Sequence, residues 1–175
     1  MTEQSFEIKT EAGVEDVLAF KEERVRVQQS LREAYHMPVI SFCMNIPGPV
    51  KTNERIRRAF ETGKTQLRKA LSEAGISCFS ETEHHTAAGD EWIAAVDAPA
   101  VTVKAVTERI EETHPYGRLF DMDVTGPDGE KQSRAVPRTC LVCGSPAFPC
   151  ARSRAHGLDA LLQAVDRILE TPVSG

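Results

Sequence analysis

The order of the predicted strands and helices constrains this chain more than any other feature of its sequence. Apolar periodicity predicts strands over residues 39–46, 76–81, 91–97 and 116–125, a helix over 52–75 and another opened by Pro99. In chain order this pattern is βαββαβ, which is the signature of the ferredoxin-like split βαβ unit. We therefore predict an α+β protein whose antiparallel sheet carries two helices on one face.

Further elements are predicted on both sides of this core. A helix over residues 14–35 precedes it, and a short strand over 130–136, a cysteine-containing loop over 137–154 and a helix from Leu158 follow it. A chain of 175 residues is near the usual size of one domain and can bury a core without disulfides. We predict a single domain over 1–175, with an N-terminal helical segment (1–37), an α+β core (38–136) and a Cys/His loop with a C-terminal helix (137–175).

The composition excludes several classes of protein. A net charge of −5 argues against general binding of duplex nucleic acid, which favours a strongly basic protein. No apolar run approaches the roughly 20 residues that cross a membrane. Residues 1–10 lack the basic start and apolar core of a signal peptide. We therefore expect a cytoplasmic protein whose five cysteines are reduced.

The charge is distributed unevenly along the chain. Residues 51–69 contain seven bases and two acids, and residues 131–154 contain five bases and no acid. Residues 73–130 are strongly acidic, with thirteen acids and three bases. Two basic regions in an acidic protein suggest a local anion site. A solvated helix face explains the first of them equally well.

Asp121 and Asp123 form the sharpest chemical feature. Residues two apart on a strand share one face, with Cα atoms about 6.5 to 7 Å apart. Two carboxylates so placed suit Mg²⁺, and they would support metal-assisted phosphoryl or nucleotidyl transfer. On spacing alone, an exposed acidic strand face is the more common explanation of such a pair.

The segment His114-Pro-Tyr-Gly-Arg118 comes directly before this pair. Arg118 is a candidate phosphate contact, but in a regular strand it would face away from the two aspartates. It reaches a phosphate beside them only if the strand starts after it or bulges there. His114 is a candidate catalytic residue, and a histidine at a helix end is the alternative interpretation.

A second candidate anion site is the turn Pro47-Gly48-Pro49-Val50-Lys51, which lies between a strand and a helix N-terminus. Free N–H groups and the helix dipole at such an end suit an anion, and Lys51 adds a charge. Arg57 and Arg58 follow, and since adjacent helix positions point in different directions, at most one should face the site. A rigid turn without a ligand is the alternative.

The last candidate site is a cluster of three cysteines and a histidine. Cys140, Cys143, Cys150 and His156 are spaced C-x2-C-x6-C-x5-H. This spacing suits a tetrahedral structural Zn²⁺, which would fold the loop and fix the last helix. Reduced, partly buried cysteines without a metal are the alternative.

Four blocks of the sequence carry a resemblance to a known family. They are Val39-Ile-Ser-Phe with Pro47-Gly-Pro-Val-Lys51; Arg57-Arg58; His114-Pro-Tyr-Gly-Arg-Leu-Phe-Asp-Met-Asp-Val124; and Arg138-Thr-Cys-Leu-Val-Cys143 with Cys150-Ala-Arg152 and His156. In these blocks the chain resembles the apo-citrate lyase phosphoribosyl-dephospho-CoA transferase family, whose members install the prosthetic group on the acyl carrier subunit of citrate lyase. The block ending in Gly-Arg-Leu-Phe-Asp-Met-Asp-Val is the most specific.

The resemblance implies a reaction and two substrates. The donor would be 2′-(5″-triphosphoribosyl)-3′-dephospho-CoA and the acceptor a serine of the apo carrier protein, with diphosphate released. Asp121 and Asp123 would then bind Mg²⁺. The candidates for the triphosphate are Gly48, Lys51, Arg57 or Arg58, and Arg118, and His114 is a candidate base or phosphate contact.

Two other functions fit the same residues. The corresponding transferase for the malonate decarboxylase carrier subunit would use the same donor and chemistry. A zinc-stabilised binding module that docks a partner through its basic loop would do no catalysis. The carboxylate pair distinguishes this last function, because a binding module does not need Asp121 and Asp123 on one face.

Overall fold

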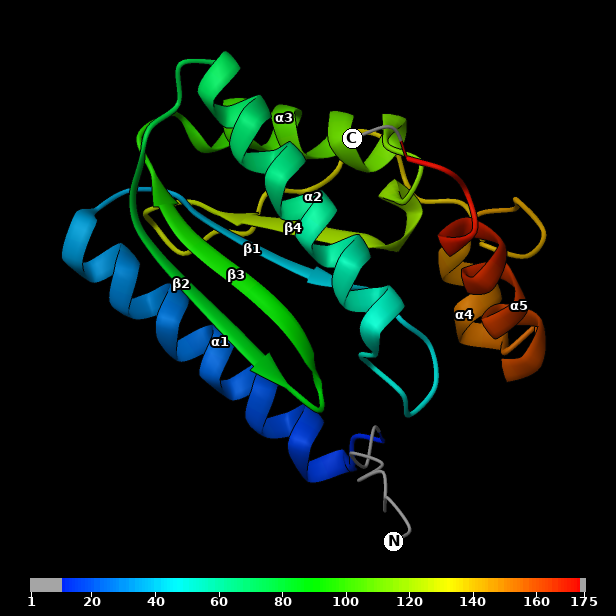
Figure 1. Ribbon diagram of the computed structural model, residues 1–175. Helices are drawn as coiled ribbons and strands as arrows, with labels where there is room; N and C mark the ends of the chain where they lie inside the picture. Colours follow the sequence, from blue (N-terminus) through cyan, green and yellow to red (C-terminus); the bar gives the residue numbers. More distant parts are fainter. Residues whose placement is uncertain (1–10, 174–175) are drawn as a thin grey trace, which may run out of the picture.

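The computed structural model describes residues 11–173 and is a mixed α and β structure (Figure 1). Its elements are α1 (Val14–Tyr35), β1 (Val39–Met44), α2 (Glu54–Glu73), β2 (Cys78–Thr86), β3 (Gly89–Val96), α3 (Ala100–Thr113), a 3-10 turn η1 (Gly117–Leu119), β4 (Phe120–Thr125), α4 (Ala147–Ser153) and α5 (Leu158–Leu169). Within the described residues the four strands form one antiparallel sheet in the order β2-β3-β1-β4. The prediction of an α+β protein with an antiparallel sheet is thereby confirmed.

The central strands are the most apolar part of the chain. The first four residues of β1 are buried, and every residue of β3 is buried, because these two strands have neighbours on both sides and helices above and below. β4 lies at one edge of the sheet, and its one neighbour among the four strands of the sheet is β1, with Cys43 opposite Asp121 and Ser41 opposite Asp123. The strand with the two candidate carboxylates is therefore an edge strand.

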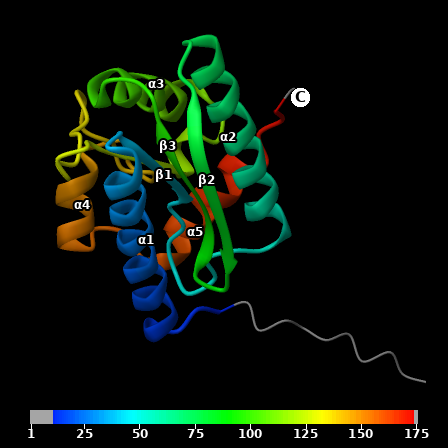
Figure 2. The same cartoon turned by 90° about the vertical axis from the view of Figure 1, so that its left-hand side faces the viewer.

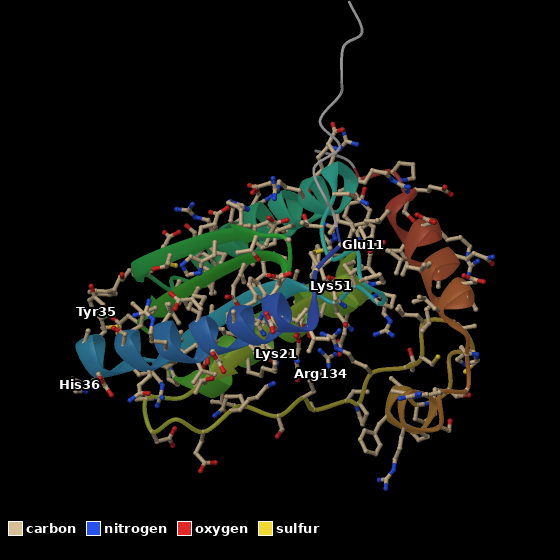
Figure 3. The ribbon with its side chains drawn as sticks, turned by 90° about the horizontal axis from the view of Figure 1, so that it is seen from below. Glu11, Lys21, Tyr35, His36, Lys51 and Arg134 are labelled. Atoms are coloured by element: carbon tan, nitrogen blue, oxygen red, sulfur yellow. The ribbon has the colours of Figure 1, made fainter. Side chains whose placement is uncertain are left out.

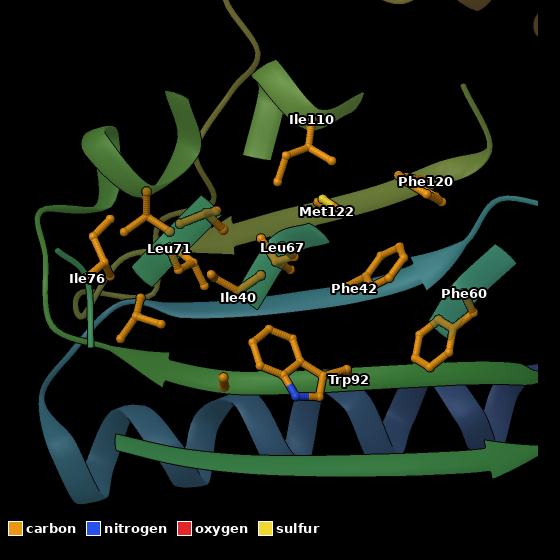
Figure 4. Packing of buried hydrophobic residues seen from close by; sticks show 14 residues of the cluster. Ile40, Phe42, Phe60, Leu67, Leu71, Ile76, Trp92, Ile110, Phe120 and Met122 are labelled. Atoms are coloured by element: carbon orange, nitrogen blue, oxygen red, sulfur yellow. The ribbon is translucent and has the colours of Figure 1, made fainter. Parts of the chain in front are cut away.

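Helices α2 and α3 cover one face of the sheet and enclose the main apolar core (Figure 4). The N-terminus of α2 is capped by Asn53, whose side chain accepts a hydrogen bond from the backbone N–H of Ile56 at 2.9 Å. A β-carbon on Gly63 would come within 2.7 Å of the Phe42 and Phe120 rings. Glycine at this helix position therefore lets α2 approach the sheet closely.

Helix α1 covers the opposite face of the sheet, and Figure 2 shows it on the other side from α2. Val27 and Leu31 of α1 pack on Val39, Ile93 and Ala95. The helix therefore covers β1 and β3. The predicted bounds of this helix, 14–35, are confirmed.

The C-terminal part of the predicted core differs from expectation. The strand predicted to begin at Tyr116 begins at Phe120, after the η1 turn. A β-carbon on Gly117 would collide with the carbonyl oxygen of Glu111, so the chain turns tightly against the end of α3 there. The strand predicted over 130–136 is reduced to a single bridge between Lys131 and Thr125.

The segment after β4 runs along the edge of the sheet and leads to the cysteine loop. That loop contains a short helix, α4, that was not predicted, and α5 then packs through Val165 on Ile46, Ile56 and Leu119. Among residues 11–173, no helix is long and apolar enough to span a membrane. Residues 1–10 of the predicted N-terminal segment lie outside the described part of the chain.

Candidate functional site

The two aspartates lie on the side of β4 that faces away from the main core. Burial alternates along the strand: Phe120, Met122 and Val124 are buried in the core, and Asp121 and Asp123 are half-buried on the other side. Strand periodicity thus places both carboxylates on one face, as the sequence predicted.

Side chains form hydrogen bonds with the backbone groups on the outer edge of β4. The Met122 backbone N–H donates to Glu111 Oε1 at 2.7 Å, and Lys104 Nζ donates to the Met122 carbonyl at 3.1 Å. Arg138 donates to the Phe120 carbonyl at 2.7 Å. An unpaired strand edge would expose these backbone groups, so the contacts both protect the edge and bring charged groups to it.

Glu111 is the centre of this arrangement. Its side chain is 3% exposed, and it forms ion pairs with Arg138 at 2.6 Å and with Arg134. Burial raises the pKa of Glu111, and the charge of Arg138 opposes that rise. Arg134 also pairs with Glu112 at 3.4 Å, so Glu111 and Glu112 together hold the two guanidinium groups at the edge of β4.

Asp121 and Asp123 line a cleft of about 380 Å³ together with Lys104, Lys131, Arg134 and Arg138. Lys131 Nζ lies 2.7 Å from Asp123 Oδ2. Burial, and then the charge of Asp123, raise the pKa of Asp121. The cleft therefore holds two crowded carboxylates within a ring of cations, which is an arrangement suited to a cation bound by the carboxylates and an anion bound by the bases.

A buried polar row continues from Asp121 across the sheet under α1. Cys43 Sγ lies 4.0 Å from Asp121 Oδ2, Arg24 donates to Cys43 Sγ at 3.2 Å, and Arg24 also pairs with the buried Glu91. The pKa of the Cys43 thiol is raised to about 12, chiefly by burial. Arg24 therefore links α1 to the strand neighbours of the carboxylate pair.

Arg118 lies in η1, so β4 starts after it, which is one of the two conditions under which it could reach a phosphate beside the aspartates. Its guanidinium donates to the Thr139 carbonyl and lines a second cavity, of about 630 Å³, between the 45–48 turn and the cysteine loop. Burial lowers the pKa of Arg118, and the neighbouring Arg138 and Arg134 charges lower it further. Arg138 lines both this cavity and the carboxylate cleft.

The residues of the predicted Pro-Gly-Pro-Lys site separate in space. Gly48, with a φ of 79°, lines the second cavity, whereas Lys51 donates to the Ile46 carbonyl at 2.7 Å and is not among the residues that line either cavity. Burial, followed by the charge of Lys21, lowers the pKa of Lys51. Lys21 of α1 is thus close enough to Lys51 for their charges to repel, and Figure 3 labels both residues.

Arg57 and Arg58 both pair with carboxylates of the protein. Arg57 lies 3.0 Å from the buried Asp90, which also accepts from Thr52 at 2.7 Å, and Arg58 lies 3.0 Å from Glu54. Arg58 is exposed on α2. These contacts favour a solvated, ion-paired helix face over a phosphate site at these two residues.

His114 ends helix α3 and does not join the aspartates. Its Nδ1 accepts from the Tyr116 backbone N–H at 3.0 Å, and its ring lies 4.9 Å from the Phe120 ring. Phe120 points to the side of the sheet opposite Asp121. Burial lowers the pKa of His114. Its contacts are those of a residue that turns the chain from α3 into η1.

The three cysteines and His156 do come together. One ligand atom from each of Cys140, Cys143, Cys150 and His156 lies within 4.8 Å of the others, so the group could hold a metal ion. His156 Nε2 is buried and has no hydrogen-bond partner among the described residues. Hydrogen bonding, chiefly with Ser145, lowers the pKa of Cys143 to about 6. Thiolate character and an unpartnered imidazole nitrogen are what a metal needs.

Sequence reasoning missed several cleft residues. Lys104 and Glu111 come from α3, and Arg134 and Arg138 come from the segment after β4. The available signal was the acid-free stretch over 131–154, which predicted a basic region but not where it would lie. Only the return of the chain along the edge of β4 brings these residues to Asp121 and Asp123.

Carboxylates and convergent bases in a cleft on an α+β fold are the groups used by enzymes that transfer phosphoryl or nucleotidyl groups. Residues 12–171 match the family model described as apo-citrate lyase phosphoribosyl-dephospho-CoA transferase, and the chain belongs to this family of transferases. Proteins of that name from Escherichia coli O139:H28 and Shigella boydii serotype 18 are each 35% identical to it over 161 residues, which cover 90% of this chain and 88% of theirs. The protein of that name from Escherichia coli O1:K1 is 34% identical over the same shares.

Proposed function

We propose that this enzyme transfers the phosphoribosyl-dephospho-CoA group from its triphosphoribosyl donor to a serine of the apo acyl carrier subunit of citrate lyase. The serine oxygen forms a bond to the α-phosphorus, the bond from that phosphorus to the next bridging oxygen breaks, and diphosphate leaves. The serine proton passes to solvent. Family membership and the cleft around Asp121 and Asp123 support this proposal.

The observation that carries the proposal is the meeting of both charge types in one cleft. Transfer of this kind develops negative charge on the α-phosphate and on the departing diphosphate, and fixed cations stabilise both. Four bases, Arg134 and Arg138 among them, line the cleft against three acids, so its lining keeps positive charge for such a ligand. Arg118 borders the same arginines and is a further candidate for the triphosphate.

We propose that Asp121 and Asp123 bind Mg²⁺. Two carboxylates with mutual repulsion form a hard oxygen donor set that fits this ion. When bound, Mg²⁺ would neutralise phosphate charge and acidify the serine hydroxyl. The placement of His114 supports no proton transfer at these carboxylates, and Lys51 donates to the Ile46 carbonyl and lies outside the lining of the cleft.

Asp121→Asn and Asp123→Asn test this assignment. Each is expected to leave the fold intact and to reduce transfer by about 10²–10⁴-fold, because charge stabilisation at the reacting phosphate is lost. The measurement is the intact mass of apo carrier protein incubated with donor, Mg²⁺ and enzyme. Modification by either variant at the wild-type rate would overturn the metal assignment.

The same assay, run with the citrate lyase carrier and with the malonate decarboxylase carrier, distinguishes the proposed function from the two alternatives. Transfer to the malonate decarboxylase carrier alone would replace the proposed acceptor while keeping the chemistry. No transfer to either, by a folded enzyme with intact donor, would favour the zinc-stabilised binding module.

We also propose that Cys140, Cys143, Cys150 and His156 bind a structural Zn²⁺. Support comes from the closeness of the four ligand atoms and from the unpartnered His156 Nε2 within the described chain. Bound zinc would fix the loop that carries α4 and so orient α5. Elemental analysis of freshly purified, reduced protein is expected to find about one zinc per chain. Its absence would remove this site.

Finally, we infer that the core is ferredoxin-like and that the chain is one domain. The strand order β2-β3-β1-β4 with α2 and α3 on one face supports the ferredoxin-like assignment. Packing of α5 on Ile56 and Leu119 supports a single unit. Reduced cysteines suit the predicted cytoplasmic location.

A further inference from the structure

We propose that the cavity between the 45–48 turn and the cysteine loop binds the nucleotide and pantetheine arm of the donor, while the carboxylate cleft binds its polyphosphate. This inference rests on the proposed function and assigns a substrate group to each cavity. It gives the Cys/His loop a second task, as a wall of the substrate site.

The first observation is that one side chain joins the two spaces. Arg138 lines the cleft with Asp121 and Asp123, and it also lines the larger cavity with Arg118 and Cys140. Its guanidinium is held by Glu111 at 2.6 Å and by the Phe120 carbonyl at 2.7 Å, and its side chain is 20% exposed. Because Arg138 is fixed where the spaces meet, one elongated ligand can contact it while occupying both.

The second observation is the contrast in chemistry between the two spaces. The cleft has a wall of charged side chains, whereas the larger cavity has apolar walls contributed by Pro47, Leu141, Ala147, Ala151, Leu158 and Leu161. A triphosphate gains nothing from apolar walls, but an adenine ring and a pantetheine chain do. The volume of the larger cavity, about 630 Å³, is within the range of sites for organic ligands.

The third observation is that cations lie within these apolar walls. Arg118 and Arg154 line the larger cavity, and Arg118 is partly buried next to Arg138. Buried like charges repel, and burial together with that repulsion lowers the pKa of Arg118. The diphosphate that joins the adenosine and pantetheine parts of the donor is an anion of the right class to relieve this repulsion.

The shape of the cavity depends on a close approach of the 45–48 turn to the start of α5. Gly48 has a φ of 79°, and a β-carbon there would come within 3.2 Å of the Leu158 side chain. Cys140, Cys150 and His156 also line the space. The turn and the Cys/His cluster therefore both contribute walls to the proposed subsite.

Filling the cavity tests the inference directly. Ala151→Trp places a large side chain at an exposed position of α4 that lines the space, and Ala105→Trp places the same group at an exposed position of α3 as a matched control. Calorimetry would measure binding of dephospho-CoA and, separately, of inorganic tripolyphosphate with Mg²⁺. We expect Ala151→Trp to weaken dephospho-CoA binding at least about tenfold, which is about 1.4 kcal/mol, and to leave tripolyphosphate binding within about twofold.

The outcomes separate this inference from the proposed function. Unchanged dephospho-CoA binding by Ala151→Trp, in a protein that still transfers the group, overturns the subsite and leaves the transferase intact. Loss of both ligands, or an equal loss in Ala105→Trp, also overturns it, because the effect would then not be confined to the cavity. Failure of the wild-type enzyme to modify any carrier protein contradicts the proposed function, whatever the ligand binding.

Discussion

The two basic regions of this chain look alike in sequence and differ in structure. Among the described residues, six of the seven bases between 51 and 69 pair with carboxylates of the protein: Arg55, Arg57, Arg58, Lys64, Arg68 and Lys69. In the segment after β4 the bases also have carboxylate partners, but they line one cleft: Arg134 and Arg138 share Glu111, Arg134 also pairs with Glu112, and Lys131 pairs with Asp123.

The difference teaches that local charge density is a poor guide to an anion site. Bases on α2 form ion pairs with acids from β2, β3, α5 and α2 itself, so most of their charge is neutralised within the fold. Bases along the edge of β4 are instead gathered in a cleft, whose lining has four bases (Lys104, Lys131, Arg134 and Arg138) and three acids (Glu111, Asp121 and Asp123), so one positive charge remains there for a ligand. Exposed pairs such as Arg58 with Glu54 contribute little to stability.

The largest effect expected from this contrast is at Arg138. Arg138→Ala should reduce transfer by about 10²–10³-fold, because a fixed charge-assisted donor at the phosphates is lost. Arg68→Ala, which breaks an exposed pair with Glu81, is the matched control and should stay within about twofold of wild type. Initial rates of carrier modification measure both. Equal losses in the two variants would break the contrast between the regions.

A smaller effect is expected when Glu111 loses its charge. Glu111→Gln can still accept the Met122 N–H, so β4 should keep its place, but Arg134 and Arg138 would be held less firmly. We expect transfer to fall about tenfold, mainly through a higher KM for the donor. A change in kcat alone would indicate that Glu111 does not act by positioning the two arginines.

The smallest effect on activity is expected at Asp90, where the change should appear in stability. Burial opposes ionisation of Asp90, but hydrogen bonds from His85, Thr52 and Arg57 outweigh it and lower its pKa. The ionised group therefore stabilises the fold above the ordinary aspartate pKa of about 3.9, and this contribution is lost as pH falls through the lower pKa of the folded state.

Asp90→Asn should accordingly unfold more easily at pH 7, by about 1–3 kcal/mol, and match the wild type near pH 2. Urea titrations at several pH values measure this. Transfer should change less than about twofold. A strong loss of activity in a stable Asp90→Asn protein would show that the α2 region belongs to the site after all.

Much of the fold was predictable because its signals are local. The bounds of α1 and the alternation along β4 follow from periodicity. The start of β4 could not be predicted, because the chain turns at Gly117 only where the backbone of α3 lies against it. Helix α4 is seven residues long and has no buried residue, so it carries no periodic signal.

The candidate site divides in the same way. The sequence by itself determined which residues share a face, as for Asp121 and Asp123, and which lie close along the chain, as for Cys140 and Cys143. Only the tertiary structure decided that Arg138 and Glu111 join the carboxylates, while Arg57 is taken by Asp90 and His114 lies across the sheet. The physical reason is that side-chain periodicity is set by the backbone of one element, whereas charge partners are set by the return of distant segments.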